Sequence, residues 1–281
     1  MAHQSAHIPN LLIVPAESIL LHEDVDLRRV GPLIDRLYAD GCLKNPPVAA
    51  PIAGPAGCVG RFVILDGANR TTALWKLQVP HHLIQVVDYH EVELDTWGHL
   101  VTGIPRPMFT RTLAEAGLEL KPTTHQDACS LLARRQIAAS IANPCEEVFA
   151  VLGDGTLISE THVLHRLAAV YNGHAVIHRV KSDHMAELLP HYDDVTALIR
   201  FPRYTPYEIL RMVDDGYKLP TGITRHVIQQ RALRVNLPLS VLTDEQLTTE
   251  EKNRWLHDWI NEKLARHEVR YYQESAFLFD E

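Results

Sequence analysis

An apolar run, a tight turn and the start of a helix follow one another in Arg61-Phe62-Val63-Ile64-Leu65-Asp66-Gly67-Ala68-Asn69-Arg70-Thr71-Thr72. The apolar residues predict a strand over Arg61–Leu65, which leads directly into the Asp66-Gly67 turn. We expect a helix over Asn69–Leu77, with Asn69 as its N-cap. A strand, a turn and a helix in immediate succession are typical of α/β proteins.

This turn has several features of a phosphate-binding site. The first N–H groups of a helix are unpaired and carry partial positive charge, so they attract anions. Gly67 lets a phosphate approach the backbone because it has no side chain, and Arg70 offers a guanidinium to phosphate oxygens. Asp66 could hold a hydrated Mg²⁺ or orient a polar substrate group. The residues expected at the phosphate are Gly67, Ala68, Asn69, Arg70, Thr71 and Thr72.

An ordinary Asp-Gly turn followed by routine helix caps would contain the same residue types. The pattern alone therefore leaves two interpretations open, a phosphate site and a common turn.

The segments on either side complete a small mixed sheet. Leu33, Ile34 and Leu37 share one face of a helix predicted over Pro32–Asp40, which Gly41 would end. Further strands are predicted at Leu11–Val14, Pro47–Ile52 and Leu83–Val87. The resulting β-α-β-β-α-β order fits a compact mixed sheet covered by two helices.

A second group of elements follows a connecting or lid segment, His90–Thr110. Its clearest signal is Thr205-Pro206-Tyr207-Glu208, which combines an N-cap, a proline at the first helical position and a glutamate three residues on. Gly153-Asp154-Gly155 is interpreted as the turn of a hairpin. A C-terminal helix begins at Thr249, and its apolar face is expected to pack on this second unit. The other predicted elements are helices over residues 125–138 and 160–171, and strands over residues 147–152, 156–158, 175–180 and 195–201.

Composition excludes several classes of protein. The 281 residues are 46% hydrophobic and 22% charged, which is incompatible with general disorder. The net charge of −8 disfavours nucleic acid as a partner, because phosphate binding needs a basic face. We find no apolar run near the roughly 20 residues of a membrane span. Met1–Asn10 lacks the apolar core of a signal peptide, so the sequence predicts a cytoplasmic protein.

Cysteine and histidine spacing gives no metal-site signature. The cysteines Cys42, Cys58, Cys129 and Cys145 are widely separated, so they are interpreted as reduced thiols. His162 and His165 are three residues apart, and His174 and His178 are four apart. Either pair could bind a metal, but neither has a third ligand nearby in the sequence.

The Asp66–Arg70 box resembles the D-G-x-x-R box of ParB/sulfiredoxin-fold proteins, over about Leu11–Tyr89. Within that superfamily it is most similar to the SbnI-like free L-serine kinases. The further segments that carry the resemblance are Leu21-His22-Glu23, Leu43-Lys44-Asn45-Pro46-Pro47, Leu219-Pro220-Thr221-Gly222-Ile223-Thr224-Arg225-His226 and Leu233-Arg234-Val235-Asn236-Leu237-Pro238-Leu239. The resemblance covers most of Leu11–Leu242.

This resemblance implies a phosphotransferase that converts free L-serine into O-phospho-L-serine, with ATP or ADP as donor and Mg²⁺. A related hydroxy amino acid such as threonine could also be the acceptor. Many members carry histidine at the third or fourth position of the box, where this chain has Ala68 and Asn69. A role of that histidine would have to fall to Asn69 or to another residue.

The resemblance also implies roles for individual residues. Glu23 falls at the family's catalytic glutamate, where it would orient the serine hydroxyl and accept its proton, and Asp66 would act with Mg²⁺. The expected substrate-binding residues are Lys44, Asn45, Trp97, Thr224, Arg225 and His226.

By residue type alone, these positions have plainer interpretations. Glu23 would lie in a solvated acidic loop, Lys44 and Asn45 would form a stiff polar strand entry, Trp97 would pack and Thr224 would cap a helix. Two further arginines, Arg231 and Arg234, are interpreted as surface residues that add positive potential.

We expect a mixed α/β fold with four parts. They are a disordered tail (1–10), a ParB/sulfiredoxin-like nucleotide-binding domain (11–105), a second α/β substrate-binding domain (106–243), and a C-terminal helix and tail (244–281). The protein would be a monomer or a homodimer.

Two other functions use the same fold. A ParB-like nucleotide-binding or DNA-binding regulator would use the box without amino-acid kinase activity, although no clear helix-turn-helix follows the first unit. Sulfiredoxin-like redox chemistry needs a cysteine near the phosphate turn, whereas Cys42 and Cys58 flank a different strand.

Overall fold

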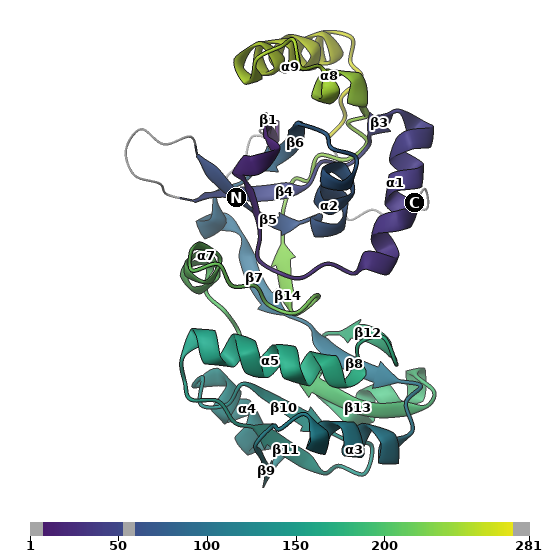
Figure 1. The fold of residues 1–281 in the computed structure, drawn as a ribbon, viewed down its shortest axis with the longest axis vertical. Helices are drawn as coiled ribbons and strands as arrows, with labels where there is room; N and C mark the ends of the chain where they lie inside the picture. The colour runs from purple at the N-terminus through teal and green to yellow at the C-terminus, as the bar shows by residue number, and fades with distance from the viewer. Residues whose placement is uncertain (1–7, 53–59, 272–281) are drawn as a thin grey trace.

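The computed structural model describes residues 8–52 and 60–271, which form two bodies joined at the middle of the molecule (Figure 1). The first body is built on a five-stranded mixed sheet and the second on a six-stranded antiparallel sheet. The predicted mixed α/β class is confirmed. Of the tail predicted over residues 1–10, residues 1–7 lie outside the described part, and Asn10 already begins the first strand.

The first sheet has the strand order β1-β6-β4-β5-β2. In β5, Phe62 and Ile64 join one apolar cluster, whereas Val63 and Leu65 join another that continues into the second body. Because alternate residues of a strand point to opposite faces, this sheet is buried on both sides, which accounts for the unbroken apolar run before Asp66. The strands are β1 (Asn10–Pro15), β2 (Ile19–Leu21), β4 (Val48–Ile52), β5 (Arg61–Asp66) and β6 (His81–Val86).

Two helices pack against each other over the first sheet (Figure 1). Helix α1 (Leu27–Asp40) begins at its N-cap Asp26, whose side chain accepts from the N–H of Arg28, and is therefore longer than predicted. Helix α2 (Ala68–Lys76) has Gly67 as its N-cap, so the prediction of Asn69 in that role is wrong.

The second sheet has the order β12-β8-β13-β10-β11-β9. Helix α5 (Leu157–Tyr171) buries Leu164 and Leu167 against this sheet. The strands are β8 (Gly98–Thr102), β9 (Leu120–Thr123), β10 (Ala139–Ala142), β11 (Val148–Val151), β12 (Val176–Val180) and β13 (Val195–Arg200). The remaining helices of this body are α3 (Arg106–Glu115), α4 (His125–Ala133), α6 (Met185–Leu188) and α7 (Pro206–Asp214).

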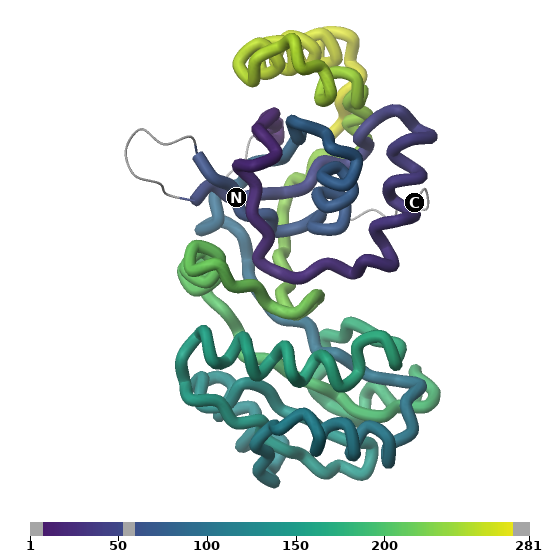
Figure 2. The backbone as a smooth tube through the Cα atoms, viewed as in Figure 1, coloured from purple at the N-terminus to yellow at the C-terminus, as the bar shows by residue number. Residues whose placement is uncertain are grey.

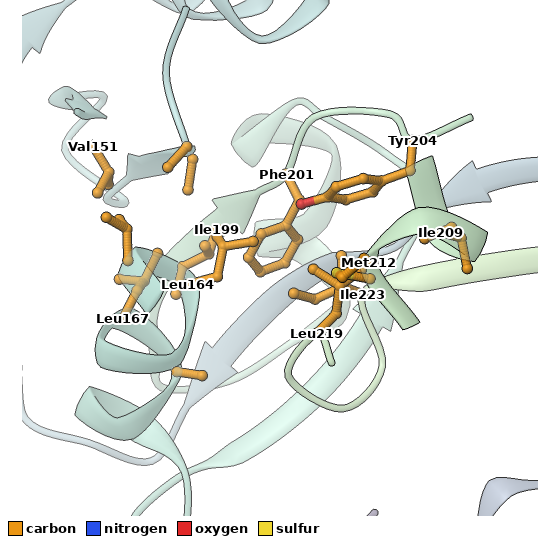
Figure 3. Packing of buried hydrophobic residues seen from close by; sticks show 14 of the residues in the cluster. Val151, Leu164, Leu167, Ile199, Phe201, Tyr204, Ile209, Met212, Leu219 and Ile223 are labelled. Carbon is orange, nitrogen blue, oxygen red and sulfur yellow. The ribbon is translucent and has the colours of Figure 1, made fainter. Parts of the chain in front are cut away.

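A two-stranded ribbon joins the bodies. The chain enters the second body through β7 (Glu93–Thr96) and returns through β14 (Thr224–Val227), which pairs with β7 (Figure 2). Around this crossing, Leu219 and Ile223 pack with Ile209 and Met212 of α7 (Figure 3). One hydrophobic cluster thus extends from the first sheet to α5.

After the crossing, the last described elements lie on the first body. Strand β15 (Leu237–Pro238) pairs with β3 (Cys42–Leu43), and α8 (Leu239–Thr243) and α9 (Thr249–Ala265) follow. In α9, Leu256 is buried in one cluster with Ile13 of β1. The prediction that the C-terminal helix packs on the second unit is therefore wrong. The predicted division at residues 105 and 243 stays a prediction.

Two local predictions are also wrong. Gly153-Asp154-Gly155 does not turn a hairpin, because it connects β11, which ends at Val151, to α5, whose N-cap is Thr156. The segment His90–Thr110 is more than a connection, since it contains β7, β8 and the start of α3. The capping box at Thr205 and Glu208 is confirmed at the start of α7. Among the described residues, we find no helix with both the length and the apolar character needed to cross a membrane.

Candidate functional site

The phosphate turn is a glycine-dependent start of helix α2. Gly67 has φ 98°, and a Cβ there would lie 3.0 Å from the Cα of Pro47. A residue with a side chain at this position would be strained by the positive φ, and its Cβ would also clash with the backbone of Pro47. The N–H of Thr71 donates to the Gly67 carbonyl at 2.9 Å, which is the first intrahelical hydrogen bond of α2. The backbone N–H groups of Ala68 to Arg70 precede this bond, at the N-terminus of the helix.

The two threonines of the box differ in their surroundings. Thr71 is fully buried, and the Thr72 hydroxyl donates to the Ala68 carbonyl at 2.9 Å. At the mouth of the turn, the backbone of Gly67 to Arg70 and nearby arginines are available to an anion, and the role predicted for Thr71 and Thr72 stays a prediction.

Asp66, the last residue of β5, is surrounded by positive charge. Its Oδ2 accepts from Arg70 Nη2 at 3.0 Å and from Arg231 Nη2. Burial raises the pKa of Asp66, but the charges of Arg231, Arg70 and Arg179 outweigh burial and lower the pKa below its usual value. Arg231, which sequence reasoning left on the surface, is thus brought to the phosphate turn by the returning chain.

Glu23 lies where the two bodies meet. Its Oε2 accepts from the N–H of Gly222 at 2.7 Å, and its Oε1 accepts from the N–H of Thr224 at 2.5 Å and from the Thr224 hydroxyl at 2.6 Å. The backbone adds a parallel bridge between Glu23 and Leu219. The Glu23 side chain is 12% exposed, so the interpretation of this glutamate as part of a solvated loop is wrong.

Histidines continue this polar cluster behind Glu23. His22 places Nδ1 2.6 Å from the Ile64 carbonyl and Nε2 2.7 Å from the Thr224 hydroxyl. His226 accepts from the Tyr89 hydroxyl at 2.8 Å, and burial, together with the charge of His22, lowers the pKa of His226 to about 2. His226 is therefore a neutral imidazole. Because Ile64 precedes Asp66 by two residues, the cluster adjoins the phosphate turn at the end of β5.

The predicted substrate-binding residues separate into three groups. Thr224 and His226 belong to the Glu23 cluster. Arg225, between them on β14, points to the other side, where it lies 5.0 Å from the Trp97 ring and 3.7 Å from Asp95. Strand alternation explains this separation.

Lys44 and Asn45 form the third group, on the first body. The Lys44 ammonium pairs with Asp40 at 2.8 Å, and Asn45 Oδ1 accepts from the N–H of Arg234 at 2.9 Å. Asn45 therefore holds the returning segment on the first body, whereas the Lys44 side chain pairs within that body.

One group of potential metal ligands occurs among the described residues. His125, Cys129 and Asp183 offer ligand atoms within 4.8 Å of one another. The guanidinium of Arg200 lies 3.1 Å from the Cys129 sulfur and 3.2 Å from an Asp183 oxygen. Arg200 thus contacts all three groups, including His125 Nε2 at 3.4 Å, so we interpret the group as an arginine-centred cross-link. Neither predicted histidine pair belongs to it.

Comparison with known proteins gives matches over nearly the whole chain. The ATP-dependent L-serine kinase SbnI of Staphylococcus aureus is 24% identical over 275 residues, covering 97% of this chain and 98% of that protein. The ATP-dependent L-serine kinase of Staphylothermus marinus is 19% identical over 237 residues, covering 82% and 90%. No family model matches the chain.

Solved structures show the same fold. A C-terminally truncated SbnI from Staphylococcus aureus superposes with a TM-score of 0.71 at 21% identity, covering 90% of this chain and 97% of that one. A glutamate-to-glutamine variant of a free serine kinase, in complex with AMP, gives a TM-score of 0.70 at 20% identity, covering 84% and 95%. The resemblance stated from the sequence is confirmed, and it extends through both bodies.

Proposed function

We propose that this chain is an ATP-dependent kinase that phosphorylates the hydroxyl group of free L-serine. The observation that carries the proposal is the adjacency of two groups at the end of β5, the Glu23 cluster and the Asp66–Arg70 turn. His22, next to Glu23, bonds to the Ile64 carbonyl at 2.6 Å, and Ile64 lies two residues before the turn. A base and a phosphate site side by side are what phosphoryl transfer to a hydroxyl requires.

The phosphate side is supplied by α2 and two arginines. The N-terminus of α2 and the guanidinium groups of Arg70 and Arg231 stabilise the charge of the nucleotide phosphates. Asp66 is the residue that would hold Mg²⁺ through water. Its lowered pKa keeps it ionised, and its side chain is 42% exposed, which suits a hydrated ion. When bound, Mg²⁺ would neutralise phosphate charge.

On the acceptor side, Glu23 takes the proton of the serine hydroxyl as the oxygen–phosphorus bond forms. The N–H groups of Gly222 and Thr224 fix the carboxylate, so little reorganisation is needed when the hydroxyl arrives. In this proposal, Thr224 holds the carboxylate of Glu23, and the neutral His226 borders the serine site. A regulator without kinase activity has no specific observation in its favour, because the likeness to serine kinases extends through both bodies.

The direct test is product analysis by mass. Purified protein with Mg²⁺ and L-serine is incubated with ATP or with ADP, and L-threonine and D-serine are assayed in parallel. We expect phosphoserine with ATP. If no phosphorylated amino acid forms with either ATP or ADP, the proposed function is ruled out.

A glutamate variant tests the role of the base. Glu23→Gln keeps one oxygen for the Thr224 donors but turns an amide N–H toward the Gly222 N–H, and it cannot take up a proton, so we expect kcat to fall by about 10²- to 10⁴-fold. ATP affinity should stay near wild type, whereas the thermal midpoint should fall by a few degrees because one backbone donor loses its acceptor. The matched control is Glu119→Gln, in the second body, whose side chain is 70% exposed. An unchanged kcat in Glu23→Gln would remove Glu23 from the mechanism.

A further inference from the structure

The carboxylate of Glu23 is surrounded by hydrogen-bond donors. The N–H of Gly222 lies 2.7 Å from Oε2, and the hydroxyl of Thr224 lies 2.6 Å from Oε1. These donors fix the position of the carboxylate, and the Thr224 hydroxyl also contacts a second acceptor, His22 Nε2, at 2.7 Å. A kinase base held in this way benefits from a second group that takes the proton onward.

The contacts around Thr224 have room for one proton more than ionised Glu23 and neutral His22 supply. The Ile64 carbonyl only accepts, so Nδ1 of His22 carries a hydrogen. The Thr224 hydroxyl has one hydrogen, yet its oxygen lies 2.6 Å from Glu23 Oε1 and 2.7 Å from His22 Nε2. Both short contacts are hydrogen bonds only if an additional proton lies on His22 Nε2 or on Glu23.

The two arrangements that satisfy every contact are related by a proton shift. In one, His22 is an imidazolium that donates to Thr224, which donates to ionised Glu23. In the other, protonated Glu23 donates to Thr224, which donates to neutral His22. They contain the same number of protons, so moving one proton across each contact converts one into the other.

We propose that Glu23, Thr224 and His22 form a proton relay, in which Nε2 of His22 is the final acceptor of the proton that leaves the serine hydroxyl. The relay deepens the proposed kinase function and rests on it. Glu23 remains the catalytic residue, whereas Thr224 and His22 are positioning residues that act through it.

The step balances in atoms and electrons. The electron pair of the serine O–H bond forms the new oxygen–phosphorus bond, and the bond between the phosphoryl group and the leaving nucleotide breaks onto the nucleotide oxygen. Before the transfer, Glu23 is ionised and Nε2 of His22 carries no hydrogen, so the cluster is one proton short and the serine proton passes to Glu23. A proton then moves from Glu23 Oε1 to Thr224, and the hydroxyl proton of Thr224 moves to His22 Nε2. The proton leaves to solvent after the product.

Two neighbouring titratable groups remain in fixed states. The His226 ring lies edge-on to His22 at 5.0 Å, and burial lowers the pKa of His226 to about 2. Tyr89 donates to His226, and burial, with the charge of Glu23, raises the pKa of Tyr89 above its usual value. His226 therefore stays neutral and Tyr89 stays protonated.

Two fixed charges complete the surroundings. The Arg179 guanidinium lies against Gly222, and Asp24, next to Glu23, pairs with His165 at 3.5 Å. Neither Arg179 nor Asp24 is hydrogen-bonded to the Thr224 hydroxyl, so a proton taken up by the cluster is shared between Glu23 and His22.

The relay can be tested without turnover, by nitrogen-15 NMR of the full chain labelled at histidine. We expect the protonation curve of His22 Nε2 to move on Glu23→Gln, and most of that movement to be lost in a Thr224→Val background. A purely electrostatic influence of Glu23 would persist without the hydroxyl. The proposal is overturned if Glu23→Gln moves the curve equally in both backgrounds, whatever the activity.

Kinetics provide the second readout. Thr224→Val keeps the N–H that bonds to Glu23 but removes the hydroxyl, so we expect kcat to fall by about 10- to 100-fold, a part of the full general-base effect, with the KM for ATP unchanged. Thr224→Ser should restore kcat to within about threefold, because it returns the hydroxyl. The proton inventory in mixed H₂O and D₂O should be curved in the wild type and linear in Thr224→Val.

His22→Gln supplies the final comparison. Residues of one relay act as a unit, so the losses in His22→Gln and Thr224→Val should be strongly non-additive. Additive losses, or equal activity in the Val and Ser variants, would overturn the relay. If the wild type makes no phosphoserine, the proposed kinase function is ruled out. The NMR comparison then still tests whether Glu23, Thr224 and His22 share a proton.

Discussion

Gly222 makes backbone hydrogen bonds to one residue of each body. Its N–H holds the carboxylate of Glu23 at 2.7 Å, while its carbonyl accepts from His99 Nε2 at 2.9 Å. Its φ of +80° is a left-handed conformation, and an added Cβ would come within 2.4 Å of Arg179 Nη2. A single residue without a side chain therefore lets the returning chain pass between the two bodies and present its amide to the base.

At the same scale, Arg231 is the residue that the fold adds to the phosphate turn. We expect Arg231→Gln to raise the KM for ATP by about tenfold, with a smaller change in the KM for L-serine, because a charged hydrogen bond to phosphate contributes about 1.5–3 kcal/mol when made. Steady-state kinetics with each substrate varied in turn provides the measurement.

Arg254→Gln is the matched control for Arg231→Gln. Arg254 is exposed on α9, in the part of the first body that also bears the Thr249 and Asn253 side chains. Arg254→Gln should leave the KM values for ATP and for L-serine unchanged. Equal effects of the two substitutions would mean that Arg231 acts only through the overall charge.

At the scale of elements, α9 completes the edge of the first sheet. Strand β1 is an edge strand, and the Asn253 side chain pairs with it as a neighbouring strand would. Asn253 Oδ1 accepts from the N–H of Ile13 at 2.9 Å, and Nδ2 donates to the Ile13 carbonyl at 2.7 Å. An edge strand with unpaired backbone groups is otherwise a template for aggregation.

We expect Asn253→Leu to lower the free energy of unfolding by about 2 kcal/mol, because it leaves the Ile13 N–H and carbonyl without these partners. Urea unfolding measures the loss, and hydrogen exchange should show faster exchange at the Ile13 amide. Asn261→Leu, an exposed position further along α9, is the control and should change stability by less than about 0.5 kcal/mol. Equal stability of the two variants would contradict the pairing.

Local signals predicted several of these elements well. The box at Thr205 and Glu208 predicted the start of α7, since both of its hydrogen bonds are made within four residues. Thr156 carried a similar signal for α5, but the glycines before it were interpreted as a hairpin turn. The apolar face of α9 predicted a helix, yet it could not specify which surface of the protein would cover that face, because the partner, Ile13, is distant in sequence.

For the whole molecule, the site depends on a chain that leaves the first body and comes back. Glu23 and Thr224 are about 200 residues apart in sequence and lie 2.6 Å apart, because β14 pairs with β7 at the crossing. Residue patterns predicted the phosphate turn, which is local. The partners of Glu23 and the approach of Arg231 to Asp66 are long-range contacts, and the sequence contained no local signal for them.

Buried neutral histidines make the fold sensitive to acid. Burial lowers the pKa of His82 and of His99 to about 4, and the pKa of His226 is lowered further. In the unfolded chain these histidines titrate near 6.5, so below that pH the unfolded state binds more protons than the folded state. Stability is therefore fully present above pH 6.5 and falls as the pH drops toward 4, by up to about 1.4 kcal/mol per pH unit for each buried histidine.

Two fully buried histidines, His82 and His99, give a combined slope of about 3 kcal/mol per pH unit, and His226 adds in the same direction. Carboxylates with lowered pKa, such as Asp66, lose their stabilising effect only below about pH 4, so the histidines dominate between pH 6.5 and 4.5.

Urea unfolding at half-unit intervals of pH measures the slope. His82→Leu should reduce it by about 1.4 kcal/mol per pH unit, whereas substitution of the exposed His257 by glutamine should leave it unchanged. The leucine of His82→Leu binds no proton in either the folded or the unfolded state. If this variant keeps the wild-type slope, the acid sensitivity therefore has an origin other than His82.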